Sequence, residues 1–156
     1  MRQAAFTRTA AETDRRRGAV GTGELRFASA GHPSPFRVQR AQGQVQLLNS
    51  LDPRHGPALA LFEQPDYPTC RCRLGPGDLF LLFTDGIYEA DNSHGEEYGH
   101  RRFLESVRRH AHLPTERLLD KVIYEVQDFA HAGNFDDDVC LVAMQVEPGF
   151  PVARRA

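Results

Sequence analysis

The sequence has no tryptophan, few cysteines and no long apolar run. Apolar stretches such as Leu79 to Phe83 are far shorter than the ~20 residues that a membrane-spanning helix needs. The N-terminus lacks the apolar core of a signal peptide, and Glu12 and Asp14 interrupt its arginines, which argues against a transit peptide. These absences predict a soluble, cytoplasmic protein without a membrane partner.

An excess of charge of one sign is also missing. The 156-residue chain has 19 basic and 21 acidic side chains, which gives a formal net charge of -2. A protein that binds nucleic acid or an anionic membrane through its surface charge needs a basic field, and this balance does not supply one. Neither partner is therefore expected, and a chain of this length is predicted to fold around one hydrophobic core.

Cysteine and histidine are too few or too scattered to predict a metal site of their own. Cys70, Cys72 and Cys140 are an odd number, which fits a reducing compartment rather than a full disulfide set. Cys70 and Cys72 share one face of a strand, but no second pair completes a zinc site. The seven histidines lack the His-x-x-x-His spacing of two ligands on one helix. We therefore interpret the cysteines as small apolar strand residues.

The first half of the chain has the pattern of antiparallel strands. Alternation of apolar and polar residues predicts a strand over 24–29 and a hairpin whose strands contain 36–38 and 45–47. Residues 49–68 are rich in proline and lack periodicity, so they are predicted to form a surface excursion. A further strand is expected over 67–74.

The second half combines short apolar strands with helices. The continuous apolar run 79–83 predicts a strand that is buried on both faces, and 139–146 predicts a final strand. Between them, apolar residues at helical spacing predict one helix over 103–111 and a longer one that begins near Pro114. Strands, a helix pair and a last strand indicate an α+β fold with antiparallel sheet rather than a βαβ alternation.

Three segments are expected along the chain. Residues 1–23 are a poorly defined segment with room for one strand, 24–147 form the folded domain, and 148–156 are a Pro/Arg-rich tail that is predicted to be disordered.

Acidic residues lie at the ends of two predicted strands. Asp85 follows the buried strand 79–83, and the cluster Asp136 to Asp138 precedes the last strand. If these strands are antiparallel neighbours, the carboxylates meet at one edge, where hard oxygen ligands suit Mg²⁺ or Mn²⁺. Aspartates also form turns and terminate strands. The residues alone leave both interpretations open.

Several short motifs occur in an order that resembles a known family. They are Ala30 to Pro35 (AGHPSP), Leu74 to Asp78 (LGPGD), Thr84 to Ile87 (TDGI), Glu89-Ala90, Gly95 to Gly99 (GEEYG) and Asp137 to Val139 (DDV). From about residue 24 to 146 the chain is similar to SpoIIE/RsbU-type serine phosphatases, the bacterial branch of the PPM metal-dependent protein phosphatases.

The resemblance implies a fold, a chemistry and a site. It implies a layered α-β-β-α sandwich in which two Mn²⁺ or Mg²⁺ ions hold a bridging water that attacks phosphorus directly. Carried over by motif, the metal site comprises Asp85, Gly86, Asp137 and Asp138, with Asp85 and Asp137 as the catalytic pair and Asp138 beside them. The implied substrate is a phosphorylated bacterial regulatory protein, such as an anti-sigma-factor antagonist.

Other residues of the motifs, and of the loop after TDGI, are not assigned a role in the site. Glu89, Asn92 and Gly99 fit the loop after the TDGI motif, where a turn-forming role and a direct role both stay open. His32 of the AGHP motif lies between Gly31 and Pro33, and we interpret it as a turn residue rather than a catalytic acid.

The chain also departs from the family. No Gly-Asp-hydrophobic-Ser-Gly-His-Gly motif precedes Ala30, so the family's bridging metal ligand has no counterpart here. Cys140 stands where the family has threonine, and Ala58 to Leu61 replaces a Pro-Leu-Gly segment. Two function classes follow: a metal-dependent phosphatase that lacks the N-terminal part of its domain, or a non-catalytic phosphatase-like binding module. Missing strands would leave open sheet edges, so a homo-oligomer is also expected.

Overall fold

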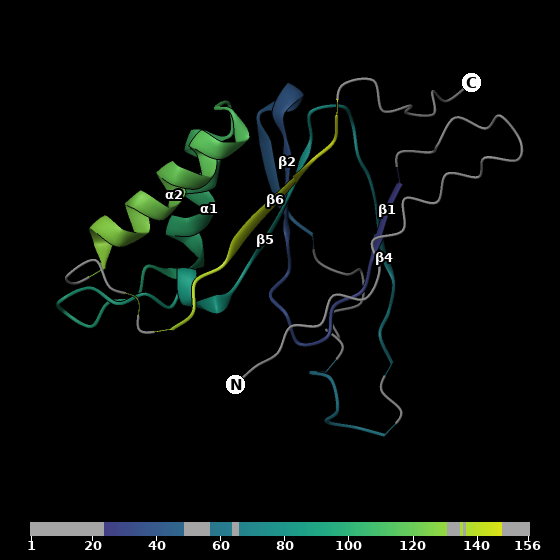
Figure 1. The fold of residues 1–156 in the computed structure, drawn as a ribbon, viewed down its shortest axis with the longest axis horizontal. Coiled ribbons are helices and arrows are strands. Elements are labelled where there is room, and N and C mark those ends of the chain that lie inside the picture. The colour runs from purple at the N-terminus through teal and green to yellow at the C-terminus, as the bar shows by residue number, and fades with distance from the viewer. Residues whose placement is uncertain (1–23, 49–56, 64–65, 131–134, 136, 148–156) are drawn as a thin grey trace, which may run out of the picture.

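A computed structural model gives the structure of residues 24–48, 57–63, 66–130, 135 and 137–147 (Figure 1). The elements in chain order are β1 (Glu24–Phe27), β2 (Phe36–Gln39), the 3-10 helix η1 (Arg40–Gln42), β3 (Gln44–Leu47), β4 (Cys70–Arg73), β5 (Leu79–Phe83), the 3-10 helix η2 (Asp85–Ile87), α1 (Gly99–His110), α2 (Thr115–Phe129) and β6 (Leu141–Gln145). The termini 1–23 and 148–156, for which a loose segment and a disordered tail are expected, lie outside the described residues.

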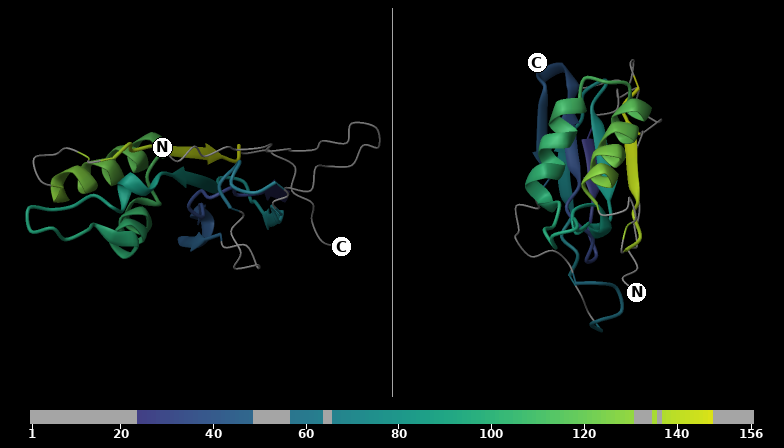
Figure 2. Two further views of the ribbon diagram at one scale, coloured as in Figure 1. Left: turned by 90° about the horizontal axis from the view of Figure 1, so that it is seen from below. Right: turned by 90° about the vertical axis from the view of Figure 1, so that its left-hand side faces the viewer.

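The strands form two antiparallel sheets. One has the order β3-β2-β5-β6, and the other is the pair β1-β4. Figures 1 and 2 show α1 and α2 against one side of the four-stranded sheet, with β1 and β4 beyond its other side. The predicted α+β class with antiparallel sheets is confirmed. Within the described ranges no helix covers β1 and β4, so three of the four expected layers are seen.

Strand β5 is the centre of this arrangement because it is apolar on both faces. Leu79, Leu81 and Phe83 point into the core beneath the helices, whereas Phe80 packs with Leu25 and Phe27 of β1. The prediction that this run is buried on both faces is confirmed. The single core expected from chain length is instead divided by the sheet into a large cluster and a small one.

The two helices present the stripes that the sequence predicts. Phe103 and Val107 of α1 and Leu118, Val122 and Val126 of α2 are all fully buried in the large cluster. Helix α2 begins directly after Pro114, whose fixed φ and missing N–H suit a helix start. Gly99 opens α1 with φ +77, a conformation that favours glycine, and its N–H donates to the carbonyl of Tyr88 at 2.8 Å.

Arg40 connects the β2-β3 hairpin to the helix pair through hydrogen bonds. Its guanidinium donates to the carbonyl oxygens of Ala111 at 3.1 Å and Leu113 at 2.7 Å, and to Oγ1 of Thr115 at 3.2 Å. These acceptors surround the connection between α1 and α2, where helix-end carbonyls lack partners within the helix. Burial lowers the pKa of Arg40, which at neutral pH stays far on the charged side.

Two strands are shorter than predicted. The ladder of β4 begins at Cys70 rather than at residue 67, since Pro68 has no N–H to donate. Strand β6 begins at Leu141 rather than at 139, because the N–H of Cys140 bonds to the side chain of Thr84 instead of to backbone. Within the described residues, neither helix is long and apolar enough to cross a membrane.

Candidate functional site

The end of β5 and the start of β6 meet at one edge of the sheet. The two strands pair antiparallel, with Phe83 opposite Leu141. The segment that follows β5 and the segment that precedes β6 therefore leave the sheet side by side. This is the arrangement on which convergence of the acidic residues depends.

Thr84 ties these two segments together. Its N–H donates to the carbonyl of Cys140 at 3.0 Å, and its hydroxyl donates to the carbonyl of Asp138 at 2.8 Å. The same hydroxyl accepts the N–H of Cys140 at 2.8 Å. Thr84 is the first residue of the TDGI motif, but the sequence predicted no role for its side chain. Its place directly before Asp85 is the signal that could have drawn attention to it.

Gly86 allows the close approach of the two segments. A Cβ atom at this buried residue would lie 2.8 Å from the carbonyl oxygen of Asp138 and 3.3 Å from that of Asp137. Backbone atoms cannot yield as a flexible side chain can, so any larger residue would push the segments apart. The structure thus brings residues 85–86 against 137–138.

The carboxylates at this junction are accessible to solvent. Asp85 is half-buried at the first position of η2, and its backbone carbonyl accepts the N–H groups of Tyr88 and Glu89, both at 3.0 Å. Asp137 is exposed, and its Oδ1 accepts the N–H of Asp138 at 2.7 Å. Asp138 is exposed as well. Asp136, the first member of the cluster, lies outside the described residues.

The donor set at this edge fits part of a site for a hard divalent cation. Carboxylate and backbone carbonyl oxygens are the ligands that Mn²⁺ and Mg²⁺ prefer, and both ions commonly complete their shells with water. Across the described ranges, no three His, Cys, Asp or Glu side chains gather closely enough to hold an ion by themselves. Asp85, Asp137 and the Gly86 carbonyl can therefore supply a portion of a coordination shell.

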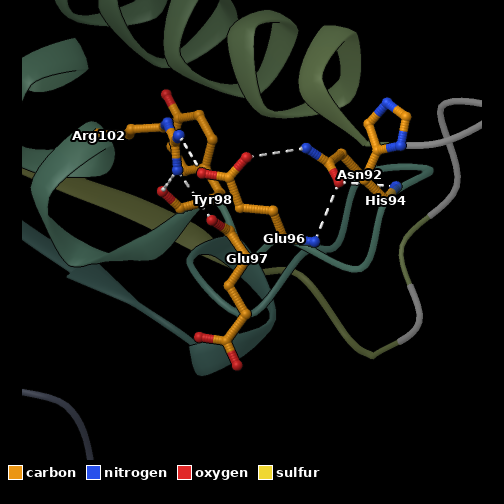
Figure 3. A network of polar contacts seen from close by, with 6 residues as sticks. All are labelled: Asn92, His94, Glu96, Glu97, Tyr98 and Arg102. Atoms are coloured by element: carbon orange, nitrogen blue, oxygen red, sulfur yellow. Dashed lines mark hydrogen bonds and ion pairs between the residues drawn. The ribbon is translucent and has the colours of Figure 1, made fainter.

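The loop after η2 is organised by Asn92 (Figure 3). Its Oδ1 accepts the backbone N–H of His94 at 2.9 Å and that of Glu96 at 3.0 Å. Its Nδ2 donates to Oε2 of Glu96 at 3.3 Å. These local bonds support the turn-forming interpretation of Asn92, while Glu89 is exposed to solvent.

Arg102 of α1 anchors the same loop. It donates to Oε1 of Glu96 at 2.5 Å and to the backbone carbonyls of Glu97 at 3.0 Å and Tyr98 at 3.2 Å (Figure 3). Its guanidinium also lies 4.9 Å from the centre of the Phe129 ring. The hydrogen bond from Arg102, with the charge of Arg102 second, lowers the pKa of the exposed Glu96 carboxyl. The loop that begins just beyond Asp85 is thereby fixed to both helices.

His32 and the cysteines of β4 take part in the fold. Nδ1 of His32 lies 2.9 Å from the carbonyl of Pro33, and Oγ of Ser29 donates to the carbonyl of His32 at 2.9 Å. Cys70 and Cys72 form no disulfide and pack against the small cluster. The structure supports the interpretation of all three as structural residues.

Solved structures place this fold in a class. The chain resembles the SiaA-PP2C domain of Pseudomonas aeruginosa (25% identity, TM-score 0.62), which it matches over 80% of its own length and 47% of that chain. It also resembles the RsbU and RsbW domains of Rv1364c from Mycobacterium tuberculosis (24% identity, TM-score 0.66), over 85% of its own length and 35% of that chain. A third similar structure is the SpoIIE phosphatase domain of Bacillus subtilis (18% identity, TM-score 0.64), matched over 96% of this chain and 58% of that chain. The fold is that of PP2C-type serine/threonine phosphatases, the PPM class.

Within that class the family can be stated. The SpoIIE family (Stage II sporulation protein E) matches residues 18–147, and the chain belongs to this family. Protein IcfG of Synechocystis is 24% identical over 125 residues, which are 80% of this chain and 19% of IcfG. The chain thus spans about a fifth of that relative and less than two thirds of each solved structure named above.

Proposed function

We propose that this chain carries part of the active site of a metal-dependent phosphoserine/phosphothreonine protein phosphatase. The observation that supports the proposal most is the junction of β5 and β6, where Gly86 lies against the backbone of Asp137 and Asp138. Membership of the SpoIIE family supports it independently of that geometry.

Each residue of the junction has a distinct role in this proposal. The carboxylates of Asp85 and Asp137 bind the ions, the carbonyl of Gly86 is a further oxygen ligand, and Asp138 lies beside them. Thr84 fixes the spacing of the two segments through its three hydrogen bonds. When bound, two divalent ions lower the pKa of the attacking water and offset the charge on the phosphoryl oxygens.

The substrate we propose is a phosphorylated bacterial regulatory protein of the anti-sigma-factor antagonist type. Similarity to an RsbU domain and to the phosphatase domain of the cell fate determinant SpoIIE supports this class. Fold similarity alone does not determine a substrate, so this assignment rests on the family rather than on the geometry of the site.

A second candidate is a non-catalytic module that binds a partner through the same scaffold. The observation that favours it is the incomplete ligand set, since the described residues hold no group of three possible metal ligands. The two functions differ in whether phosphate esters are hydrolysed.

Mn²⁺ titration of the 156-residue chain tests the metal site. Bound Mn²⁺ relieves the repulsion between the carboxylates of Asp85 and Asp137, so the melting temperature should rise. The stabilisation should reach about 2.7 kcal/mol at a Mn²⁺ concentration of about 100 times Kd. Asp85→Asn should abolish the rise, and Gly86→Ala should weaken it without removing a carboxylate. Asp91→Asn, which changes the same charge on an exposed loop residue nearby, should leave the rise intact.

Calorimetry and turnover then separate the possible outcomes. Equal Mn²⁺ binding by the wild type and Asp85→Asn would overturn the shared site. We expect this chain to bind Mn²⁺ without hydrolysing p-nitrophenyl phosphate. A polypeptide extended with the Gly-Asp-x-Ser-Gly-x-Gly segment should hydrolyse it. Absence of turnover in both would favour the non-catalytic module.

A further inference from the structure

A groove extends along α2 to the candidate metal site. It has a volume of about 720 Å³ and lies between α2 and the segment that leads into β6. Asp137 and Asp138 line the groove, so residues that we assign to the metal site form part of its wall. A molecule that holds a phosphate ester at the metal site therefore has this groove beside it.

One part of the groove wall is apolar. Leu119 and Ile123 of α2 line it and are half-buried, so each leaves apolar surface open to the groove. Tyr124 also lines it and is 61% exposed. Apolar surface that stays accessible next to polar groups is typical of an interaction site. This part of the wall suits aliphatic side chains of a partner.

The charged part of the wall is acidic. Asp120, Asp137 and Asp138 are exposed and line the groove, and none of the lining residues that the structure describes is basic. The ammonium of Lys121 lies 5.9 Å from the centre of the Tyr124 ring, but Lys121 itself is not part of the lining. A concave surface with charge of one sign attracts a ligand of the opposite sign. The wall thus complements a segment that combines aliphatic and basic side chains.

The two ends of the groove can be assigned from the course of α2. Helix α2 lies beside β6 (Figure 2), and Oγ1 of Thr115 at its start donates to Oε1 of Gln145 at the end of β6, at 2.5 Å. The helix and the strand therefore run in opposite directions, and the aspartates that precede β6 lie beside the later turns of α2. Asp120 lies at the far end, about 10 Å along the helix axis from Gln127, at roughly 1.5 Å per residue. An extended peptide covers this length in about three residues.

We propose that the groove binds the part of the phosphoprotein substrate next to its phosphorylated residue and selects a basic side chain three or four residues away. The phosphorylated residue faces Asp85 and Asp137. Aliphatic residues beside it cover Leu119 and Ile123, and the basic side chain forms an ion pair with Asp120. This inference rests on the proposed function and adds a sequence preference to it. Asp120 acts in binding and takes no part in the reaction.

Titration of synthetic phosphopeptides into the isotope-labelled chain, followed by amide chemical shifts, tests the preference. Two peptides each carry one phosphoserine between leucines. They differ only in the residue four positions away on both sides, which is lysine in one and glutamate in the other, because a bound peptide can run in either direction. Mg²⁺ is used, since unlike Mn²⁺ it does not broaden the signals. The lysine peptide should shift amides within 119–127 and 137–141 and bind about fivefold more tightly than the glutamate peptide.

Charge reversal at Asp120 assigns the preference to one residue. Asp120→Lys should invert the preference, so that the glutamate peptide binds more tightly. Asp128→Lys makes the same change at an exposed residue of α2 that lines a different groove, so it should leave the preference unchanged. An unaltered preference in Asp120→Lys, equal affinity of the wild type for both peptides, or shifts only outside the groove would each overturn the inference.

Unphosphorylated forms of the same peptides separate this inference from the proposed function. Contacts with the groove need neither phosphate nor metal, so the lysine preference should persist without Mg²⁺ at a lower overall affinity. If it persists while Mn²⁺ binding does not depend on Asp85, the metal site is wrong and the groove stands. Phosphopeptides that bind only with Mg²⁺ and show no lysine preference would leave the metal site intact and overturn the groove. Absence of shifts with every peptide would overturn it as well.

Discussion

The two hydrophobic clusters on either side of the four-stranded sheet are built very differently. Among the residues that the structure describes, sixteen buried ones form a cluster beneath α1 and α2, whereas three form the cluster that faces β1 and β4. In the large cluster the ring centroids of Phe36, Phe83 and Phe103 lie within 5.1 Å of one another. In the small cluster one ring pair is seen, Phe27 and Phe80, whose centroids are 5.3 Å apart. Free energy of folding is therefore concentrated on the helix side.

The candidate site belongs to the better packed side. Asp85 and Asp137 extend from β5 and β6, which the helices cover, and the loop beyond Asp85 is bonded to α1. Strands β1 and β4 have few buried neighbours, so they should open locally before the rest of the sheet. The candidate site at this edge can therefore keep its geometry while the second sheet fluctuates.

Removing a ring from the large cluster should have the largest effect. Phe103 is fully buried between Phe36 and Phe83, so Phe103→Ala creates a cavity and should cost about 3–5 kcal/mol of unfolding free energy. Urea denaturation followed by circular dichroism measures the loss. A loss below about 1 kcal/mol would show that the large cluster is not the main source of stability.

The equivalent truncation in the small cluster should cost less. Phe27 retains 9% exposure and contacts one other ring, so Phe27→Ala should cost about 2 kcal/mol. Hydrogen exchange should show protection lost in β1 and β4 and retained in β5 and β6. Loss of protection in all four strands together would mean that the two clusters unfold as one unit.

Polar substitution within the small cluster should have a smaller effect than removing a ring. Cys70 and Cys72 are half-buried against this cluster, so changing both to serine should cost about 1 kcal/mol, because two hydroxyl groups enter an apolar contact. Metal content should not change, since we assign the cysteines no metal role. Zinc bound stoichiometrically by the wild type and lost from the double variant would contradict that assignment.

The smallest effect is expected outside both clusters. Ala60 lies in an exposed loop with φ +65, a conformation that costs an L-residue roughly 1–2 kcal/mol. Ala60→Gly relieves this cost but adds chain entropy to the unfolded state, so a net stabilisation of at most about 1 kcal/mol should remain. A higher midpoint of thermal unfolding would show it, and a lower midpoint would contradict the left-handed conformation.

Local patterns predicted most of the elements and the edge at which the site lies. The apolar run before Asp85 and the helical stripes are properties of neighbouring residues, so they are visible in the sequence. That β5 pairs with β6 could be stated only as a condition, because Phe83 and Leu141 are far apart in the chain and strand partners are chosen by the whole fold. Family resemblance rather than periodicity favoured a metal site there.

Contacts made by long or small polar side chains could not be predicted. Arg40 and Arg102 reach acceptors whose positions depend on how the helices pack, and Thr84 bonds to the backbone before β6 only because the two strands are neighbours. The resemblance implied Gly86 only as part of the metal site, whereas the structure shows that a side chain at this position would collide with the backbone of a second segment.

The bonds made by Arg40 have a consequence for the order of folding. They join residues that are 71, 73 and 75 positions apart, so they can form only after a long stretch of chain has been closed. The helix pair and the β2-β3 hairpin each consist of local contacts and can form earlier. Arg40→Met should therefore leave the refolding rate nearly unchanged and accelerate unfolding, which stopped-flow kinetics would resolve. The Arg40 side chain would then form its bonds after the folding transition state and slow the unfolding of the native state.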